Sequence, residues 1–131
     1  MGLIHPDKGE IFVKDNYPRT FSVCFQQNTL LDNLSVNQNI QLVAGKNVVA
    51  TMLDGNLSIK ELSGGMKRLA QIERALLSDS QIVVMDEPFT GLDDTTKEMA
   101  IKYINEKLGR RTLIITSHDV KDLEALNCKM L

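Results

Sequence analysis

The sequence predicts an α/β fold built on a mostly parallel sheet, and two observations lead to that prediction. Short apolar runs rich in β-branched residues alternate with segments whose apolar residues recur every three or four positions. This rhythm is typical of parallel strands, which need helical crossovers to connect them. The 131 residues, 43% hydrophobic and 24% charged, are sufficient for one globular domain with a single core.

The first elements are short. Residues 1–4 are apolar and precede Pro6, which indicates the end of a helix. Residues 11–13 predict a brief strand, and residues 15–18 predict the turn that follows it. Residues 21–25 alternate in polarity, a pattern typical of a strand with one buried face.

The segment between residues 30 and 62 predicts helices in short pieces. Ser35 and Gln38 have the spacing of a capping box that opens a helix, and Gly45 would end that helix. Residues 48–53 predict a second short helix, closed by the Asp-Gly pair that follows.

The second half of the chain has the clearest periodicity. Residues 63–77 predict a helix that stops at a Ser-Asp-Ser break. Residues 81–85 predict a strand, and their β-branched, apolar stretch 82–85 is typical of a strand covered on both faces; residues 112–116 predict a second buried strand. Each strand is followed by a helix with an aspartate at its cap. Asp93 or Asp94 would cap a helix that runs to Leu108, and Asp119 would cap one that runs through Leu126.

Charge and hydropathy exclude several classes of protein. The net charge of −2 gives no reason to expect a nucleic-acid partner, because duplex binders carry basic patches. Cys24 and Cys128 have no metal-ligand spacing and are expected to be inert thiols in a reducing compartment. No apolar run approaches the roughly 20 residues of a membrane span, so a cytoplasmic protein is expected.

Two adjacent carboxylates, Asp86 and Glu87, stand at the end of the apolar run over residues 82–85 and are followed by a proline. Acidic groups at the edge of a core are costly unless a cation or hydrogen-bond donors meet them. Asp86 is therefore a candidate ligand of Mg²⁺, and Glu87 a candidate base for an attacking water. A solvated turn after a strand is the alternative interpretation.

Three further segments carry candidate chemistry. Ser63, Gly64 and Gly65 open a helix, where free N–H groups and a hydroxyl can hold an anion, although a simple serine cap has the same pattern. His118 lies between a strand and a helix start, where an imidazole can donate to a phosphate or play a structural role. Gln26 follows a strand and could offer its side-chain carbonyl to a metal or water. Most glutamines at the end of a strand have no special role, which is the alternative interpretation.

Together these segments resemble the nucleotide-binding domain of ABC ATPases in order and spacing. The corresponding family segments are the Q-loop, the signature motif, the Walker B strand with its catalytic glutamate, the D-loop and the switch histidine. In the same order, they match Gln26 and residues 62–65, 84–88, 90–93 and 116–119.

The resemblance covers essentially the whole chain. It implies a partial P-loop NTPase fold of the ABC type, a three-layer sandwich with a mostly parallel sheet. Residues 27–62 would be a reduced helical subdomain, and residues 63–131 would hold the signature helix, Walker B, D-loop and switch histidine.

The resemblance also implies a role for each matching residue, with ATP and Mg²⁺ as cofactors. Asp86 and Gln26 would hold the metal, Glu87 would activate water, and His118 would contact the γ-phosphate. Ser63, Gly64 and Gly65 would bind the ATP that is held mainly by a second domain. Asp93 would couple the two ATP sites.

Three departures from the family pattern change the expectation. The Walker A pattern, GxxxxGK followed by Ser or Thr, occurs nowhere in the 131 residues and would lie just upstream of Gly2. The chain is therefore expected to be a fragment or truncated product that is inactive alone. The signature continues with Met66 instead of glutamine, which should be tolerated, and the interval between Gln26 and Ser63 is short.

The function implied is that of the ATP-binding subunit of an ABC transporter. Its partners would be transmembrane permease subunits and a second nucleotide-binding domain, which would hold it at the inner face of the membrane. Two alternatives stay open. One is an inactive remnant or partner-binding module, and the other is a fragment of a non-transport ABC ATPase of the translation-factor type.

Overall fold

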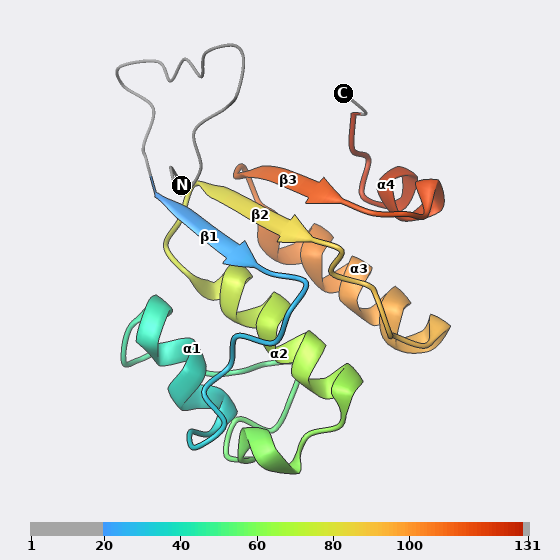
Figure 1. Cartoon of the computed structure of the whole chain (residues 1–131). Coiled ribbons are helices and arrows are strands. Elements are labelled where there is room, and N and C mark those ends of the chain that lie inside the picture. The colour runs from blue at the N-terminus through green and yellow to red at the C-terminus, as the bar shows by residue number, and fades with distance from the viewer. Residues whose placement is uncertain (1–19, 130–131) are drawn as a thin grey trace, which may run out of the picture.

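Three parallel strands lie side by side, with helices across one face, in the computed structural model of the chain (Figure 1). The structure describes residues 20–129. The predicted helix end at residues 1–4, the strand at 11–13 and the turn at 15–18 lie outside the described residues.

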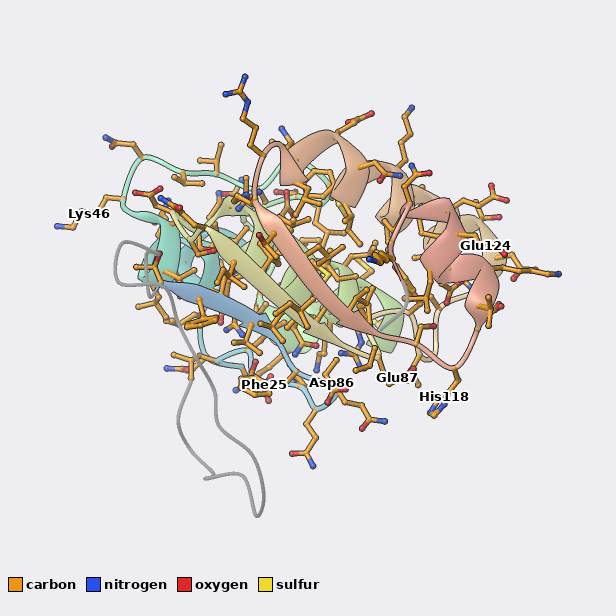
Figure 2. All side chains as sticks on the ribbon, turned by 90° about the horizontal axis from the view of Figure 1, so that it is seen from above. Phe25, Lys46, Asp86, Glu87, His118 and Glu124 are labelled. Atoms are coloured by element: carbon orange, nitrogen blue, oxygen red, sulfur yellow. The ribbon has the colours of Figure 1, made fainter. Side chains whose placement is uncertain are left out.

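The sheet contains β1 (Phe21–Cys24), β2 (Ile82–Asp86) and β3 (Thr112–Thr116), in that spatial order. Both pairings are parallel, and the register places Asp86 beside Thr116. The three predicted strands that fall within residues 20–129 are confirmed, and so is the α/β class. Because the strands are parallel, their carboxyl ends meet at one edge, where Figure 2 shows Asp86, Glu87 and His118.

Most helices begin where the capping signals predicted. The helices are α1 (Val36–Ala44), η1 (Ile59–Glu61), α2 (Gly64–Leu77), α3 (Asp94–Leu108) and α4 (Val120–Ala125). The four α-helices have Ser35, Ser63, Asp93 and Asp119 at their N-caps. Across residues 20–129, no helix has both the length and the apolar character needed to cross a membrane.

The predicted helix at residues 48–53 is wrong, because this segment is irregular. Three of its backbone N–H groups donate to side chains from elsewhere in the fold instead of to a helical ladder. The Ala50 N–H donates to Asn37 Oδ1 at 2.7 Å. The N–H groups of Thr51 and Met52 both donate to Glu73 Oε1, at 2.5 and 3.0 Å. Tertiary acceptors have replaced local hydrogen bonds here.

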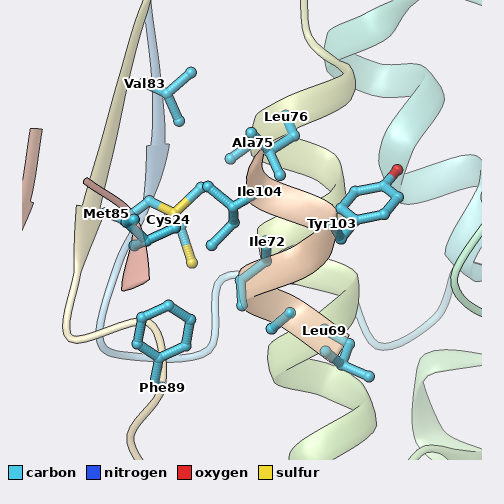
Figure 3. Packing of buried hydrophobic residues seen from close by; sticks show 12 residues of the cluster. Cys24, Leu69, Ile72, Ala75, Leu76, Val83, Met85, Phe89, Tyr103 and Ile104 are labelled. Atoms are coloured by element: carbon cyan, nitrogen blue, oxygen red, sulfur yellow. The ribbon is translucent and has the colours of Figure 1, made fainter. Parts of the chain in front are cut away.

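The core lies between the sheet and the helical layer (Figure 3). Val83 and Met85 of β2 are fully buried against side chains of α2 and α3, among them Ile72 and Ile104. The opposite face of the sheet is more open, since Ile114 of β3 remains 48% exposed. The predicted coverage of residues 81–85 on both faces is not reached within residues 20–129, where Ile82 and Val84 of β2 are only half-buried.

Tyr103 of α3 makes stability sensitive to alkaline pH. Its hydroxyl donates to the buried Glu73 carboxylate at 3.1 Å, and burial, helped by that carboxylate, raises the pKa of Tyr103 from 10.0 to about 12. The unfolded chain loses this proton near pH 10, so the stabilisation is complete below that pH and lost as pH rises towards 12.

The free energy of unfolding should therefore fall when urea titrations are moved from about pH 9 to about pH 11. Tyr103→Phe should remove this component of the fall. An identical alkaline slope in the variant and the parent chain would contradict the assignment to Tyr103.

Candidate functional site

The two residues predicted to be catalytic come together at the carboxyl edge of the sheet. His118 Nε2 lies 3.5 Å from Glu87 Oε1. The glutamate side chain is only 14% exposed, whereas the histidine side chain is 92% exposed. A sheltered carboxylate thus lies beside an imidazole that is open to solvent and to a ligand.

Thr116, the last residue of β3, holds both acidic residues at the end of β2. Its hydroxyl donates to Asp86 Oδ1 at 2.7 Å and accepts the backbone N–H of Glu87 at 3.0 Å. Thr116 belongs to the segment predicted to carry the switch histidine, but its own role was not predicted. Its role depends on the parallel register between β2 and β3, which the sequence does not reveal.

The backbone of Glu87 is in the left-handed region, with φ of 47°. A glutamate in this region is uncommon and strained, and such strain concentrates at functional sites. The next residue, Pro88, is buried and cannot extend the ladder. The chain therefore turns sharply after Asp86, which directs Glu87 away from the path of the strand.

Gln26 and Asp86 line a common hollow of about 340 Å³. Its other walls come from Phe25, Gln27 and Thr29. An amide carbonyl and a carboxylate are hard oxygen donors of the kind Mg²⁺ prefers, and this ion keeps several waters besides a few protein ligands. No group of three or more His, Cys, Asp or Glu side chains suitable for a metal occurs among residues 20–129. The donors present fit a magnesium ion held by one carboxylate.

Three polar side chains of α2 hold the segment that carries Gln26. Arg68 donates to the carbonyl oxygens of Phe25, at 2.7 Å, and Gln26. The buried Gln71 donates to the Gln27 carbonyl at 2.8 Å. Arg74 donates to the carbonyl oxygen of Thr29 at 3.0 Å and to its hydroxyl oxygen at 2.6 Å. These contacts were not predicted, although polar residues spaced by three on an apolar helix were a usable signal.

The glycines at the start of α2 are not required by packing. A Cβ on Gly64 would meet nothing within 4 Å, and one on Gly65 would meet only Leu92, at an ordinary 3.6 Å. Ser63 caps the helix, with its Oγ accepting the Met66 N–H at 3.2 Å. Gly64 also borders a hollow of about 240 Å³ together with Lys67 and Arg68. This open, positively charged helix start can accept an anion.

Asp93 has a structural role as the N-cap of α3. One carboxylate oxygen accepts the Thr96 N–H at 2.9 Å, and the other accepts the Thr96 hydroxyl at 2.7 Å. These hydrogen bonds, the backbone one first, lower the pKa of Asp93. Within residues 20–129, no hydrogen bond or ion pair joins Ser63 or Asp93 to the Glu87–His118 pair. The predicted site residues thus form separate groups.

A sequence profile described as ABC transporter matches residues 1–90. The chain belongs to the ABC transporter family. This match confirms the family predicted from the motifs, which is a family of ATP-binding domains with the P-loop NTPase fold. The roles predicted for individual residues remain predictions.

Relatives in this family include both export and import proteins. The chain is 30% identical to the Nod factor export ATP-binding protein I of Burkholderia orbicola, over 96% of its own length and 50% of that protein. It is 27% identical to the thiamine import ATP-binding protein ThiQ of Vibrio parahaemolyticus, over 95% of its length and 64% of ThiQ. It also matches 9% of the ABC transporter ced-7 of Caenorhabditis elegans at 31% identity. The chain thus spans under two thirds of each of these relatives.

The ABC fold is also found by comparison with solved structures. The dimeric, post-hydrolysis structure of the ATP-binding cassette MJ0796 with ADP and Pi superposes with a TM-score of 0.69. The superposition covers 81% of this chain and 55% of that one, at 23% sequence identity. At this identity the likeness establishes the fold.

Proposed function

We propose that this chain is part of the ATP-binding subunit of an ABC transporter, which couples ATP hydrolysis at a head-to-tail dimer interface to transport. The 3.5 Å separation of Glu87 Oε1 and His118 Nε2, beside Asp86, is the observation that carries the proposal. Hydrolysis of a phosphoanhydride needs a group that positions water and a group that contacts the transferred phosphate. Two adjacent side chains at the carboxyl edge of the sheet meet that need.

Glu87 would orient the attacking water and accept its proton as the water oxygen bonds to the γ-phosphorus and the bond to ADP breaks. Its low exposure of 14% shields the carboxylate from bulk water, which strengthens its interactions. His118, which is 92% exposed, would donate to a γ-phosphate oxygen. The two side chains would thus contact the nucleophile and the electrophile of one reaction.

Asp86 and Gln26 would hold Mg²⁺, because both border the hollow at the end of β1 and β2. When bound, the ion neutralises charge on the phosphates of ATP. Thr116 fixes the Asp86 carboxylate through its 2.7 Å hydrogen bond, and the contacts from Arg68 fix the backbone at Gln26. The two ligand-bearing segments are thus supported from different elements.

Ser63, Gly64 and Gly65 would contact the γ-phosphate of an ATP held mainly by the second nucleotide-binding domain. Ser63 Oγ already accepts a hydrogen bond, so its own proton is left to donate to a phosphate oxygen. The two glycines allow backbone N–H groups to approach the anion closely. Asp93, at the exposed start of α3, would couple the two sites across the interface.

The remaining partners would be transmembrane permease subunits, which would hold this subunit on the cytoplasmic side of the membrane. The names of two relatives support this, since one is an ATP-binding protein of Nod factor export and the other of thiamine import. The predicted reduced helical subdomain over residues 27–62 would contribute the contact with the permease.

A chimaera tests the proposal. The 131 residues contain no Walker A pattern, so this chain alone should show no ATP hydrolysis above the buffer rate. Fusing it behind a ThiQ segment in which the family pattern predicts a Walker A loop should restore Mg²⁺-dependent hydrolysis, which is measured as release of inorganic phosphate.

A chimaera that folds and binds a fluorescent ATP analogue without hydrolysing ATP would contradict the proposal. That outcome would instead support an inactive module that keeps only contacts with partners.

A further inference from the structure

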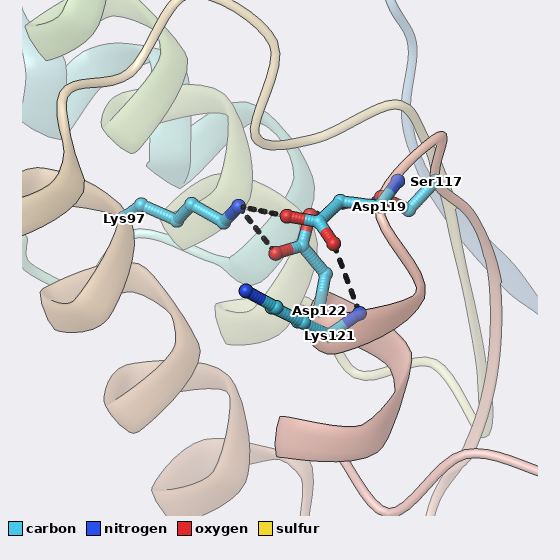
Figure 4. Close-up of polar contacts among 5 residues, drawn as sticks. All are labelled: Lys97, Ser117, Asp119, Lys121 and Asp122. Carbon is cyan, nitrogen blue, oxygen red and sulfur yellow. Dashed lines mark hydrogen bonds and ion pairs between the residues drawn. The ribbon is translucent and has the colours of Figure 1, made fainter.

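Lys97, in the first turn of α3, forms ion pairs with two aspartates that follow the predicted switch histidine (Figure 4). Its Nζ lies 2.5 Å from Asp122 Oδ1 and 3.2 Å from Asp119 Oδ2. The Asp122 side chain is only 4% exposed and the Lys97 side chain 23% exposed. The pair with Asp122 is thus sheltered from solvent, which makes it stronger than an ordinary surface ion pair.

Asp122 also holds the two residues that flank His118 in the sequence, Ser117 directly and Asp119 through Ser117. Ser117 Oγ donates to Asp122 Oδ2 at 2.9 Å and accepts the backbone N–H of Asp119 at 3.1 Å. A continuous chain of contacts therefore runs from Lys97 through Asp122 to the turn that carries His118. The imidazole itself is 92% exposed, and among the described contacts only Glu87 meets it. Its position must therefore be set mainly by the backbone of this turn.

Removing the Lys97 charge would leave Asp119 and Asp122 facing each other without their shared cation. Hydrogen bonding to Asp122 raises the pKa of Lys97, and the Lys121 N–H together with Lys97 lowers that of Asp119, so both ends of the network are charged at neutral pH. A nearly buried carboxylate that loses its partner is strongly destabilised. Opening the turn to hydrate Asp122 would relieve this cost.

Lys97 also belongs to the segment that follows β2. Its backbone N–H donates to the carbonyl of Asp93, the N-cap residue, at 2.9 Å. Lys97 thus connects α3, the helix that follows Glu87 in the sequence, with the turn that carries His118. The two turns come from different strands, so their relative placement needs a contact of this kind.

We propose that Lys97 is a positioning residue, which fixes the Ser117–Asp122 turn and thereby sets the place of His118 against Glu87. Its importance for hydrolysis rests on the proposed function, but the link from Lys97 to the turn does not. Without Lys97, His118 would sample positions away from the carboxylate.

NMR of the nucleotide-free 131-residue chain tests this inference. In K97M, the nuclear Overhauser effect between the His118 ring and the Glu87 side chain should be lost. The Asp119 amide should exchange with solvent about tenfold faster or more, while amides of β2 keep their rates. K97R, which keeps the charge, should retain the Overhauser effect and the Asp119 exchange rate of the parent chain. K102M, an exposed lysine of the same helix, is the matched control and should match the parent chain.

An unchanged Overhauser effect and Asp119 exchange rate in K97M would overturn the inference. So would an equal acceleration of all amides, because that would mean a general loss of stability. Since no nucleotide is present, absence of ATP hydrolysis in the chimaera would contradict the proposed function without affecting this readout.

Discussion

Glu87→Gln should lower the kcat of the ThiQ chimaera by about 10²- to 10⁴-fold, the usual contribution of a general base. Glutamine keeps the size of the side chain and its place beside His118, but it cannot accept the proton of the attacking water. Binding of ATP should therefore change little, and the loss should be seen in kcat. The backbone at φ 47° should tolerate the substitution, since neither side chain is β-branched.

Steady-state phosphate release, measured together with binding of a fluorescent ATP analogue, separates these two effects. Glu98→Gln is the matched control, because Glu98 is an exposed carboxylate on α3 and should leave kcat within about twofold. A Glu87→Gln chimaera that hydrolyses ATP at the parent rate would show that Glu87 is not the base.

Glu73→Leu should destabilise the chain by about 2–4 kcal/mol. Glu73 is fully buried in α2, and its Oε1 accepts hydrogen bonds from the N–H groups of Thr51 and Met52 and from two hydroxyls. Leucine fills a similar volume but leaves two backbone donors unpaired. A hydrogen bond to a charged group contributes roughly 1.5–3 kcal/mol, and less where the donor can turn to water, as at the exposed Thr51.

An opposing effect is the cost of burying a carboxylate. Glu73 Oε2 has no hydrogen-bond partner in the described structure, and leucine would remove that cost. We expect the loss of acceptors to dominate, because four donors converge on the other oxygen and join the irregular segment to α2 and α3. The carboxylate is therefore already well compensated.

Urea unfolding of Glu73→Leu and of a control variant measures which of the two effects dominates. Glu98→Leu, at an exposed position, should change the free energy of unfolding by less than about 0.5 kcal/mol. Tyr103→Phe should cost less in the Glu73→Leu background than in the parent, since their hydrogen bond is then already absent. A Glu73→Leu chain as stable as the parent would mean that desolvation of the carboxylate dominates instead.

Local signals in the sequence determined the boundaries of most elements. Ser35, Ser63, Asp119 and one of the pair Asp93 and Asp94 were predicted at helix starts, and the structure has Ser35, Ser63, Asp93 and Asp119 at N-caps. A cap satisfies N–H groups two or three residues away, so its pattern is readable without knowledge of the fold. The order of the motifs likewise identified the family, because their spacing follows the succession of strands and helices.

Tertiary structure alone decided the contacts that join distant segments. The irregular path of residues 48–53 depends on Glu73 and Asn37, and the placement of Asp86 depends on Thr116. The apolar run of β2 also did not reveal which of its faces the helices cover. Hydrophobic pattern and capping describe a residue relative to its neighbours in sequence, whereas these contacts arise only when parallel strands bring remote residues to one edge.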